Sequence, residues 1–497
     1  MNTALLIFYL LLTLYIAWRI NKKYIPETNS LILPAALVFK YIYAFFFYFI
    51  YTVYYGGGEL TADAGRFFEE SKILHEVFYT SPGDFFQFLF GLNNAPEFIN
   101  TYLSQTNHWN AGEQFLLNDS RNVMRANALF LFISNGSVYV HFLLFSFASF
   151  LGGIDLYQFV KRHSNIPKTL LLLIILLAPS IAFWSSSIIK EPLLILGLFI
   201  FIRGVFDALP IKRRLWRILL GGILLIGFKP YVFIAVMVGL GFYLIFSRLT
   251  RYQLTNLIIF TAVGLASLYF TGSLNKMTHV ISKQQEDFIN VRDGGLYLDA
   301  GPNKYYYIYY NNRSNFKIEG KKAVLVKPSG AMIMNIDNNF DRRPLKLKQV
   351  GDTFDIEVFM TKAGSGFEIT PIKDDLGTMI TMIPEVLFNT YVRPLPHRYK
   401  NWLTMPAFIE NIIYILALIL AFTLYRNSTS TIVNRKLWSM AIIAVTISLI
   451  VGWTTPVAGA VVRYIIPAQA LLLVIILIKF DWKQFVSNLF SSTRERS

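Results

Sequence analysis

The sequence predicts an all-α polytopic membrane protein with about eleven transmembrane helices and a small β-rich insert outside the membrane. Hydrophobic residues make up 54% of the 497 residues, and the mean hydropathy is +0.46. Apolar runs of about 17–25 residues recur along the whole chain, and each is long enough to cross a hydrocarbon core about 30 Å thick. Soluble domains are rarely so apolar, so the bilayer is the expected solvent for much of the chain.

The net charge of +16 suggests the same environment. In a soluble protein this charge would indicate a nucleic-acid partner. Here the basic residues collect between apolar runs, where they hold cytoplasmic loops against anionic lipid, so membrane lipid is the expected partner and nucleic acid is not. Cysteine is absent, which excludes disulfides, thiolate metal sites and a cysteine nucleophile.

The first apolar run is predicted to be a retained span rather than a signal peptide. No basic residue precedes it, and Arg19, Lys22 and Lys23 come at its end and after it, which reverses the order of a signal peptide. The predicted spans are, in chain order, 3–20, 31–55, 136–160, 168–184, 190–208, 214–228, 231–247, 254–272, 406–425, 436–453 and 462–479.

Basic residues alternate between the two sides of these spans. Loops after odd-numbered spans and their flanks are rich in cations, whereas the short loops after even-numbered spans hold about one each, namely Lys190, Lys229 and Arg463. The positive-inside rule then places the N-terminus outside and the C-terminus in the cytoplasm. The domain division that follows is 1–272 for the first eight spans, 273–405 for an outer segment, 406–480 for the last three spans and 481–497 for a cytoplasmic tail.

Two large segments fall on the outer side. Residues 56–126 contain "RFFEESKILHEVFY" and "GDFFQFLFGL", which are too short and polar to cross a membrane and are predicted to lie in its interface as amphipathic helices. Residues 273–405 contain short strand-like stretches: "KYYYIYYNN", "KKAVLVKP", "AMIMNI", "DTFDIEVFMT" and "GFEITPI". These predict a β-rich insert over residues 302–372, followed by an interfacial helix near "MITMIPEVLFNTYV".

The first candidate site residue is Asp63, in "GGGELTADAGRFFEES" just after the second span, with Glu59 four residues before it. A carboxylate at the membrane surface can act as a general base or bind a divalent cation such as Mg²⁺ or Mn²⁺. The alternative is structural, because Asp63 can instead cap a helix that starts near Ala64.

A second candidate lies in "APSIAFWSSSIIKEPLLI", at the outer turn between two spans. Lys190 is a cation that can receive phosphate, with three serines before it and Glu191 after it. The alternative is that Glu191 and Pro192 form an ordinary first helical turn while Lys190 snorkels to the interface.

The remaining candidates are basic. Lys229 lies in "GFKPYVF", Arg393 and His397 lie in "YVRPLPHRYKNW", and Arg463 lies in "GAVVRYIIPAQ". Arginine suits bidentate phosphate contact and lysine suits contact as a point charge. Each residue alone can be a membrane anchor, but the predicted topology places all of them on the face that carries Asp63, which favours an anionic ligand.

These features resemble the GT-C superfamily of membrane glycosyltransferases, which have many spans, juxtamembrane helices in the first outer loop and a catalytic carboxylate early in that loop. Asp63 occupies the matching position, and "RYIIP" resembles a late-helix signature whose arginine meets donor phosphate. The motifs "PSIAFWSSSIIKEP", "RPLPHRYKNW" and "RYIIP" also look like polytopic proteins of Bacteroidetes-type bacteria that occur beside surface-polysaccharide genes.

The resemblance implies an enzyme of the bacterial inner membrane that works at its outer face. Its donor is a polyprenyl-phosphate-linked sugar or oligosaccharide, and its acceptor is a glycan, lipid or protein. The implied catalytic residues are Asp63 and Glu59, with Asp63 as the metal ligand, and the implied substrate-binding residues are Lys190, Glu191, Lys229, Arg393, His397 and Arg463. An O-antigen-type polymerase or ligase, which relies on outer-face arginines without a metal, is the alternative. A transporter or flippase of lipid-linked glycans ranks third, because no hydropathy repeat is found and the charges cluster on one side.

Overall fold

The computed structural model shows a mostly helical chain, with 70% of it in helices, and a small antiparallel sheet. The structure describes residues 2–494 apart from 107, 110–117, 247–258, 260–261, 265–266, 268–272, 336–341, 358–361, 373, 396–402 and 426–429. Within these residues, five helices are long and apolar enough to cross a membrane, or six if a bent pair counts as one span. The chain is therefore a membrane protein. The five helices cover Thr3–Tyr24, Ile32–Tyr54, Val138–Val160, Thr404–Thr423 and Thr431–Thr454.

The expected count of about eleven spans is not confirmed, mainly because several apolar helices are short. Helix α8 (Lys168–Leu177) has 10 residues, α10 (Glu191–Phe206) has 16 and α12 (Pro230–Phe246) has 17. At a rise of about 1.5 Å per residue, α10 is only about 24 Å long. Helix α11 (Ile211–Phe228) carries four cations in its first two turns. The predicted span 254–272 lies mostly outside the described residues.

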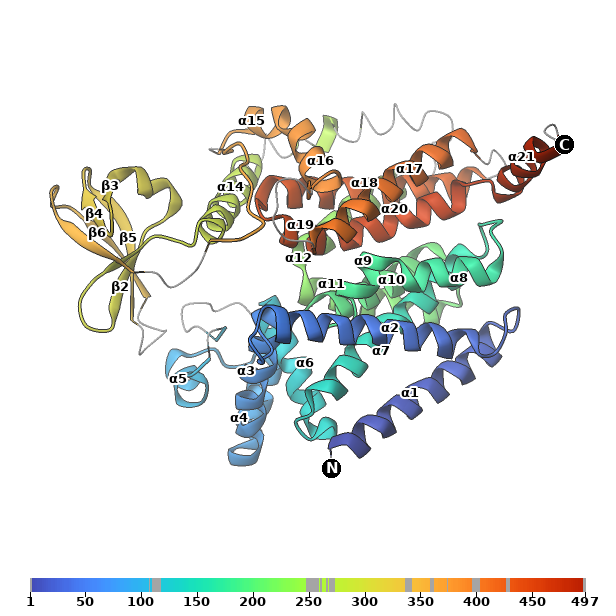
Figure 1. Cartoon of the computed structure of the whole chain (residues 1–497), viewed down its shortest axis with the longest axis horizontal. Helices are drawn as coiled ribbons and strands as arrows, with labels where there is room; N and C mark the ends of the chain where they lie inside the picture. The colour runs from blue at the N-terminus through green and yellow to red at the C-terminus, as the bar shows by residue number, and fades with distance from the viewer. Residues whose placement is uncertain are drawn as a thin grey trace.

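The N-terminal half forms one side of the helical bundle. Helices α1 (Asn2–Tyr24) and α2 (Ile32–Phe49, extended by a π-helical turn to Tyr54) lie antiparallel beside α7 (Val138–Val160) (Figure 1). Helices α10 and α11 approach closely through glycine. A Cβ atom on Gly197 would lie 2.6 Å from Cβ of Leu224, and one on Gly221 would lie 2.8 Å from the carbonyl oxygen of Gly197. Small residues allow this close backbone packing.

A group of shorter helices crosses one end of this bundle. They are α3 (Ala62–Thr80), α4 (Pro82–Phe90), α5 (Pro96–Leu103) and α6 (Asp119–Ser134). Figure 1 shows α3 and α4 running across the long axes of α1 and α2. Helices α3 and α4 contain the two amphipathic stretches of the sequence, and their apolar faces are buried through residues such as Phe67 and Phe85.

The C-terminal half packs against this first part. It consists of α14 (Ser273–Arg292), α15 (Leu376–Thr381), α16 (Ile383–Tyr391), α17 (Thr404–Thr423), α18 (Thr431–Thr454), α19 (Ala458–Tyr464), α20 (Ile466–Lys479) and α21 (Trp482–Arg494). Helices α19 and α20 meet at an angle of 52°. This bend lies next to Pro467, in the first turn of α20, where a missing N–H allows the helix direction to change.

The sheet contains seven strands in the order β3-β4-β7-β1-β2-β5-β6, and every neighbouring pair is antiparallel. The strands are β1 (Tyr297–Asp299), β2 (Lys304–Tyr307), β3 (Phe316–Glu319), β4 (Lys322–Leu325), β5 (Ser329–Asn335), β6 (Arg342–Leu347) and β7 (Thr353–Glu357), with a 3₁₀ helix η2 (Tyr310–Asn315). The sheet has its own core around Leu298 and Leu325.

Every predicted strand stretch contains a strand except "GFEITPI". That segment instead joins the helical part of the chain. The N–H of Phe367 donates to the carbonyl of Pro456 at 2.9 Å, and Phe367 and Ile369 belong to the main helical core. The chain leaves and re-enters this part at one place, because the N–H of Ala363 donates to the carbonyl of Arg292 at 2.9 Å.

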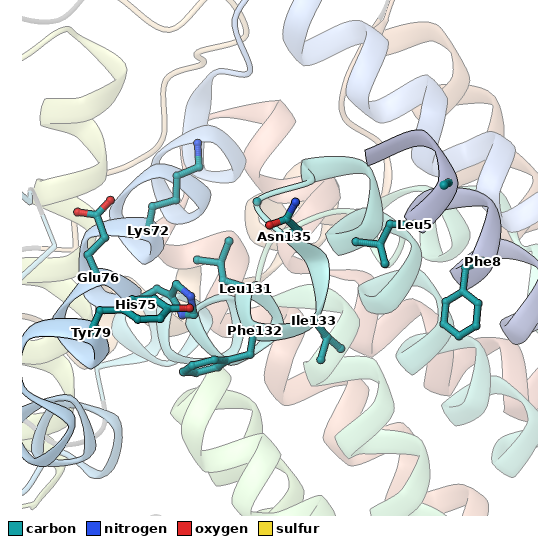
Figure 2. A pocket seen from close by; sticks show the side chains of 12 residues that line it. Leu5, Phe8, Lys72, His75, Glu76, Tyr79, Leu131, Phe132, Ile133 and Asn135 are labelled. Carbon is teal, nitrogen blue, oxygen red and sulfur yellow. The ribbon is translucent and has the colours of Figure 1, made fainter. Parts of the chain in front are cut away.

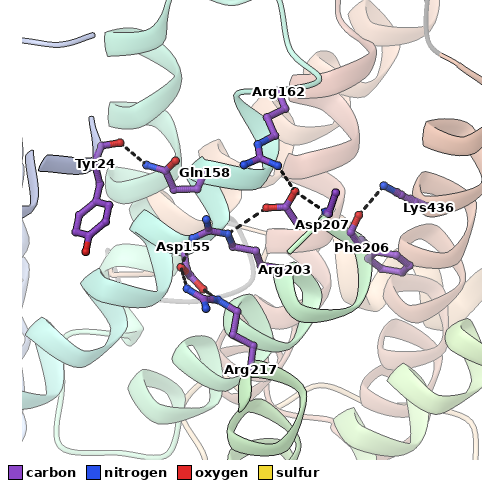
Figure 3. Close-up of polar contacts among 10 residues, drawn as sticks. Tyr24, Asp155, Gln158, Arg162, Arg203, Phe206, Asp207, Arg217 and Lys436 are labelled. Atoms are coloured by element: carbon purple, nitrogen blue, oxygen red, sulfur yellow. Dashed lines mark hydrogen bonds and ion pairs between the residues drawn. The ribbon is translucent and has the colours of Figure 1, made fainter. Parts of the chain in front are cut away.

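An ion-pair network holds the helices together at the end of the bundle away from α3 (Figure 3). Asp155 pairs with both Arg203 and Arg217, and Asp207 accepts from Arg162 at 2.6 Å. Lys436 donates to the carbonyl of Phe206 at 2.5 Å. Most of these cations are among those that the sequence places in cytoplasmic loops.

Candidate functional site

One arginine joins two carboxylates from distant parts of the chain. Arg463 Nη1 lies 2.6 Å from Oδ2 of Asp63, and Arg463 Nε lies 2.9 Å from Oε1 of Glu191. Lys229 Nζ lies 2.9 Å from the same Oε1 and 4.1 Å from the ring centre of Tyr464. Four residues that the sequence singled out separately therefore form one charged network.

Each member of the network lies at the end of a helix. Asp63 and Glu191 are in the first turns of α3 and α10, Arg463 is in the last turn of α19, and Lys229 lies between α11 and α12. Acidic groups near helix N-termini and basic groups near C-termini are favoured by the helix dipole. The same placement gathers side chains from four helices at one end of the bundle.

Asp63 is not the N-cap of its helix, so that structural alternative is wrong. Helix α3 begins at Ala62, and Thr61 occupies the cap position without capping, because its hydroxyl donates to the carbonyl of Tyr51 at 2.8 Å. The preceding turn requires glycine, since a Cβ on Gly56 would lie 1.9 Å from the carbonyl oxygen of Glu59. This tight turn brings Asp63 back over the end of the bundle.

The side chains of the network become progressively more exposed from Glu191 and Lys229 to Asp63. The side chains of Glu191 and Lys229 are 0% and 3% exposed, whereas Arg463 is 13% and Asp63 is 45% exposed. Burial raises the pKa of Asp63, but the Arg463 charge and its hydrogen bond lower it by more, so the pKa of this carboxyl lies below its ordinary value. Asp63 is thus an ionised group that solvent or a ligand can reach.

Lys190 belongs to a second pair beside the network. Its Nζ lies 2.8 Å from Oδ1 of Asp119, in the first turn of α6, and the charge of Lys190 also acts on Asp63. Lys190 is therefore an ion-pair partner as well as a helix-end residue. Asp119 was missed in the sequence analysis, although "NDSR" carries the usual signal of a helix start, and the Asn118 side chain accepts from the N–H of Arg121.

The six charged residues of the network and of the neighbouring Lys190–Asp119 pair carry no net charge. Asp63, Asp119 and Glu191 balance Lys190, Lys229 and Arg463. The sequence analysis expected a set of cations waiting for an anion. The structure shows that each of these cations already faces a carboxylate, so an incoming phosphate would have to share or displace one.

Arg393 lies apart from these pairs. Its guanidinium carbon is 4.4 Å from the ring centre of Phe367, and its Nε and Nη1 atoms are buried with no hydrogen-bond partner among the described residues. Arg393 follows α16, which packs against α19, the helix of Arg463. Glu59 is exposed, and no contact of its carboxylate is found in the described part of the chain. His397 lies outside the described residues.

Two buried charged residues that the sequence analysis missed bracket the short helix α9 (Pro179–Trp184). At its N-terminus, Glu410 accepts from the N–H of Ser180 at 2.9 Å and also from its hydroxyl. After its C-terminus, Lys40 Nζ donates to Oγ of Ser185 at 2.8 Å. The helix dipole favours this arrangement, because the acidic Glu410 lies at the N-terminus of α9 and the basic Lys40 lies near its C-terminus. A lysine inside "LVFKYIY" and a glutamate inside "AFIENIIY" were the available signals, and these contacts hold the turn that leads to Lys190 and Glu191.

Asp63 as the ligand of a divalent cation stays a prediction. A site for Mg²⁺ or Mn²⁺ needs several oxygen ligands, usually with more than one carboxylate. Here Oδ2 of Asp63 faces a guanidinium, and no group of three or more His, Asp or Glu side chains suited to a metal is found in the part of the chain that the structure describes. The chemistry below is therefore built on the ion pairs.

The fold and the site together define a helical membrane protein with a charged cluster at one end of its bundle and a small sheet domain attached at that end (Figure 1). No family model, no curated protein and no solved structure matches the chain.

Proposed function

We propose that the protein is a membrane glycosyltransferase that takes a sugar or oligosaccharide from a polyprenyl-phosphate-linked donor at the outer face of a bacterial inner membrane. The observation that carries the proposal is the meeting of Asp63, Glu191, Lys229 and Arg463 at the end of the bundle. Charged residues in membrane segments are costly and are commonly functional. The acceptor class is a glycan, a lipid or a protein.

The proposed topology has about eleven crossings, with the N-terminus outside and the C-terminus in the cytoplasm. The shorter helices α8, α10, α11 and α12 are assigned as crossings because they pack beside the long ones. Helix α20, with 14 residues, is about 21 Å long. Because α19 and α20 together count as one bent span and Arg463 lies in α19, we place the cluster within this span rather than beyond it. A polar site within a span suits a phosphate that is carried on a lipid.

The residues divide into two roles. Glu191 and Lys229 are buried and hold the Arg463 guanidinium in place, whereas Asp63 is half-exposed and Lys190 is partly exposed beside it, so these two are assigned to contact substrate. In the transfer step the acceptor oxygen bonds to the anomeric carbon of the donor sugar, the bond from that carbon to the phosphate oxygen breaks, and the phosphate keeps the electron pair. Lys190 stabilises this phosphate charge electrostatically.

Asp63 takes the proton of the acceptor hydroxyl group in this scheme. Its low pKa makes it a weak base, so proton transfer comes late, when the hydroxyl has become acidic by bonding to the sugar. After Asp63 is protonated, the positive charge of Arg463 is still balanced by Glu191, to which it stays bound.

Asp63→Asn tests the proposal directly, because it keeps the shape of the side chain and removes its charge. In a strain lacking the natural gene, this variant should reduce surface-glycan formation per membrane-inserted protein by at least about 100-fold, the range of a lost general base. The lipid-linked donor should accumulate at the same time. Glu97→Gln is the matched control, since Glu97 is an exposed acid of α5 outside the network. Wild-type activity in Asp63→Asn would remove Asp63 from catalysis.

An O-antigen-type polymerase or ligase is the second candidate. It is favoured by the contact of Asp63 with Arg463, which makes the arginine rather than the acid the central group. This candidate predicts that Arg463→Lys is inactive while Asp63→Asn keeps measurable activity, and that treatment with a chelator leaves transfer unchanged. If the protein is a glycosyltransferase with Asp63 as its base, Asp63→Asn should instead be the less active of the two variants.

A further inference from the structure

A groove opens between the start of α1 and the helices that cross the bundle end (Figure 2). Its volume is about 810 Å³. Three segments distant in sequence form its walls: the first turns of α1, the second half of α3, and the end of α6 with the turn that follows. The groove does not include any member of the Asp63 network.

The two sides of the groove differ in chemistry. Leu5 and Phe8 of α1 form an apolar side, and Phe8 is 55% exposed. On the other side α3 presents Lys72 and Glu76, and Figure 2 shows these two side chains next to each other on the same face of the helix. An occupant therefore needs an apolar part and a part that carries both signs of charge.

The floor between the two sides is firmly packed. The ring of Phe132 lies 4.4 Å from the ring of His75, and Nδ1 of His75 lies 3.0 Å from the carbonyl oxygen of Ala128. These contacts fix α3 against α6. The groove is thus a preformed feature, which lowers the entropic cost of binding a ligand there.

The groove also lies at the boundary of a membrane-crossing helix. The apolar span that contains α1 starts at Thr3, so Leu5 and Phe8 belong to its first turns. The ends of spans lie where hydrocarbon meets the headgroup layer. An occupant with its apolar part against α1 and its polar part against α3 has the orientation of a phospholipid in that layer.

The charged side chains on α3 limit which types of lipid headgroup can bind in the groove. Lys72 Nζ lies 2.8 Å from Oε1 of Glu69, in an exposed pair of the kind that is weak and easily shared. Glu76 is exposed, and no hydrogen bond or ion pair of its carboxylate is found within the described residues. Residues four apart on a helix are neighbours on one face, with Cβ atoms about 6 Å apart, so Lys72 and Glu76 can reach the same headgroup.

We propose that this groove binds one zwitterionic phospholipid with a primary ammonium group, of the phosphatidylethanolamine type. The phosphate lies at Lys72, the ammonium donates to Glu76, and an acyl chain lies along Leu5 and Phe8. A primary ammonium has three N–H donors for the carboxylate, whereas a choline headgroup has none. The groove therefore distinguishes the two lipids, and an anionic glycerol headgroup is disfavoured by Glu76.

Lipid retention tests the proposal on the purified full-length protein. The protein is exchanged into detergent micelles with equal mole fractions of dioleoyl phosphatidylethanolamine, phosphatidylcholine and phosphatidylglycerol, and bound lipid is measured by native mass spectrometry. The ethanolamine lipid should be retained about tenfold over the choline lipid, the ratio expected from one charge-assisted hydrogen bond. Glu76→Gln should abolish this preference, and Lys72→Gln should weaken retention of all three lipids.

Glu97→Gln, which changes an exposed acid on α5 outside the groove, is the matched control and should retain lipid as the wild type does. Equal retention of the ethanolamine and choline lipids by the wild type would overturn the proposal. A preference that persists in Glu76→Gln would overturn it as well. Because the groove variants leave the Asp63 network intact, their lipid binding can be measured whatever the outcome of the activity tests.

Discussion

Arg463 and Asp63 lie 400 positions apart in the chain, yet Nη1 of the arginine is 2.6 Å from Oδ2 of the aspartate. The contact joins the start of α3 to the end of α19. Because Arg463 also binds Glu191, and Glu191 binds Lys229, one arginine links four segments of the bundle.

The buried part of this network should dominate its contribution to stability. Glu191→Gln leaves Lys229 buried without a carboxylate, which should lower the free energy of unfolding by about 3–5 kcal/mol. Denaturant unfolding in detergent measures the loss. The double variant Glu191→Leu/Lys229→Met removes both of these charges and should recover part of the loss, since an apolar pair can replace a buried ion pair, while Arg463 still loses its contact with Glu191. Failure of the double variant to recover would mean that packing rather than charge sets the loss.

Lys190 should affect activity much more than stability. Lys190→Ala breaks a partly exposed pair with Asp119, so the stability cost should be about 1 kcal/mol. Transfer activity per inserted protein should fall by about tenfold or more, and Lys190→Arg should retain part of it because charge is kept while geometry changes. The matched control is Lys161→Ala, whose 2.7 Å pair with Glu27 has similar exposure outside the network. Equal activity loss in both variants would make Lys190 a structural residue.

The pKa of Asp63 predicts the pH range in which the stability of the protein changes. Because the pKa in the folded state is depressed, the stability from the Asp63–Arg463 pair is present above the ordinary pKa and is lost as pH falls through the folded value. Melting temperatures of wild type and Asp63→Asn should therefore change in parallel from pH 7 to pH 5. Below about pH 4, near the ordinary aspartate pKa, the wild type should lose additional stability. Divergence of the two curves near neutral pH would contradict a depressed pKa.

The sheet domain should be removable if the cut follows its true ends. Replacing residues 295–361 with a short glycine linker joins segments that already touch, since the N–H of Ala363 donates to the carbonyl of Arg292. This protein should be recovered from membranes in folded form, as judged by size-exclusion chromatography. Deleting residues 302–372 instead removes Phe367 and Ile369 from the main core and should reduce recovery. Equal recovery of both deletions would show that these side chains add little.

Reporter fusions test the proposed membrane topology. Fusions truncated after Phe85 or Lys346 should report an outside location, and fusions after Arg213 or Arg494 should report a cytoplasmic one. The reason is the excess of lysine and arginine in the loops assigned to the cytoplasm. A cytoplasmic signal at Lys346 would invert the orientation and remove the outer-face assignment of the Asp63 network.

The sequence by itself determined the membrane class, because a run of apolar residues needs no partner to favour lipid over water. Local patterns also predicted the amphipathic stretches of α3 and α4 and several strands of the sheet. The first-turn position of Glu191 followed from the proline after it. Each of these features depends on residues within a few turns of one another.

Only the tertiary structure decided which charges meet. Whether Lys190 faces phosphate, water or Asp119 depends on where α6 packs against α10, and no local pattern encodes that distance. The same holds for Arg463 and for Lys40 and Glu410 at the two ends of α9. The span count stays unconfirmed for a related reason. A short helix such as α8 buries part of its apolar surface against neighbouring helices, and that burial appears only when the helices are packed together.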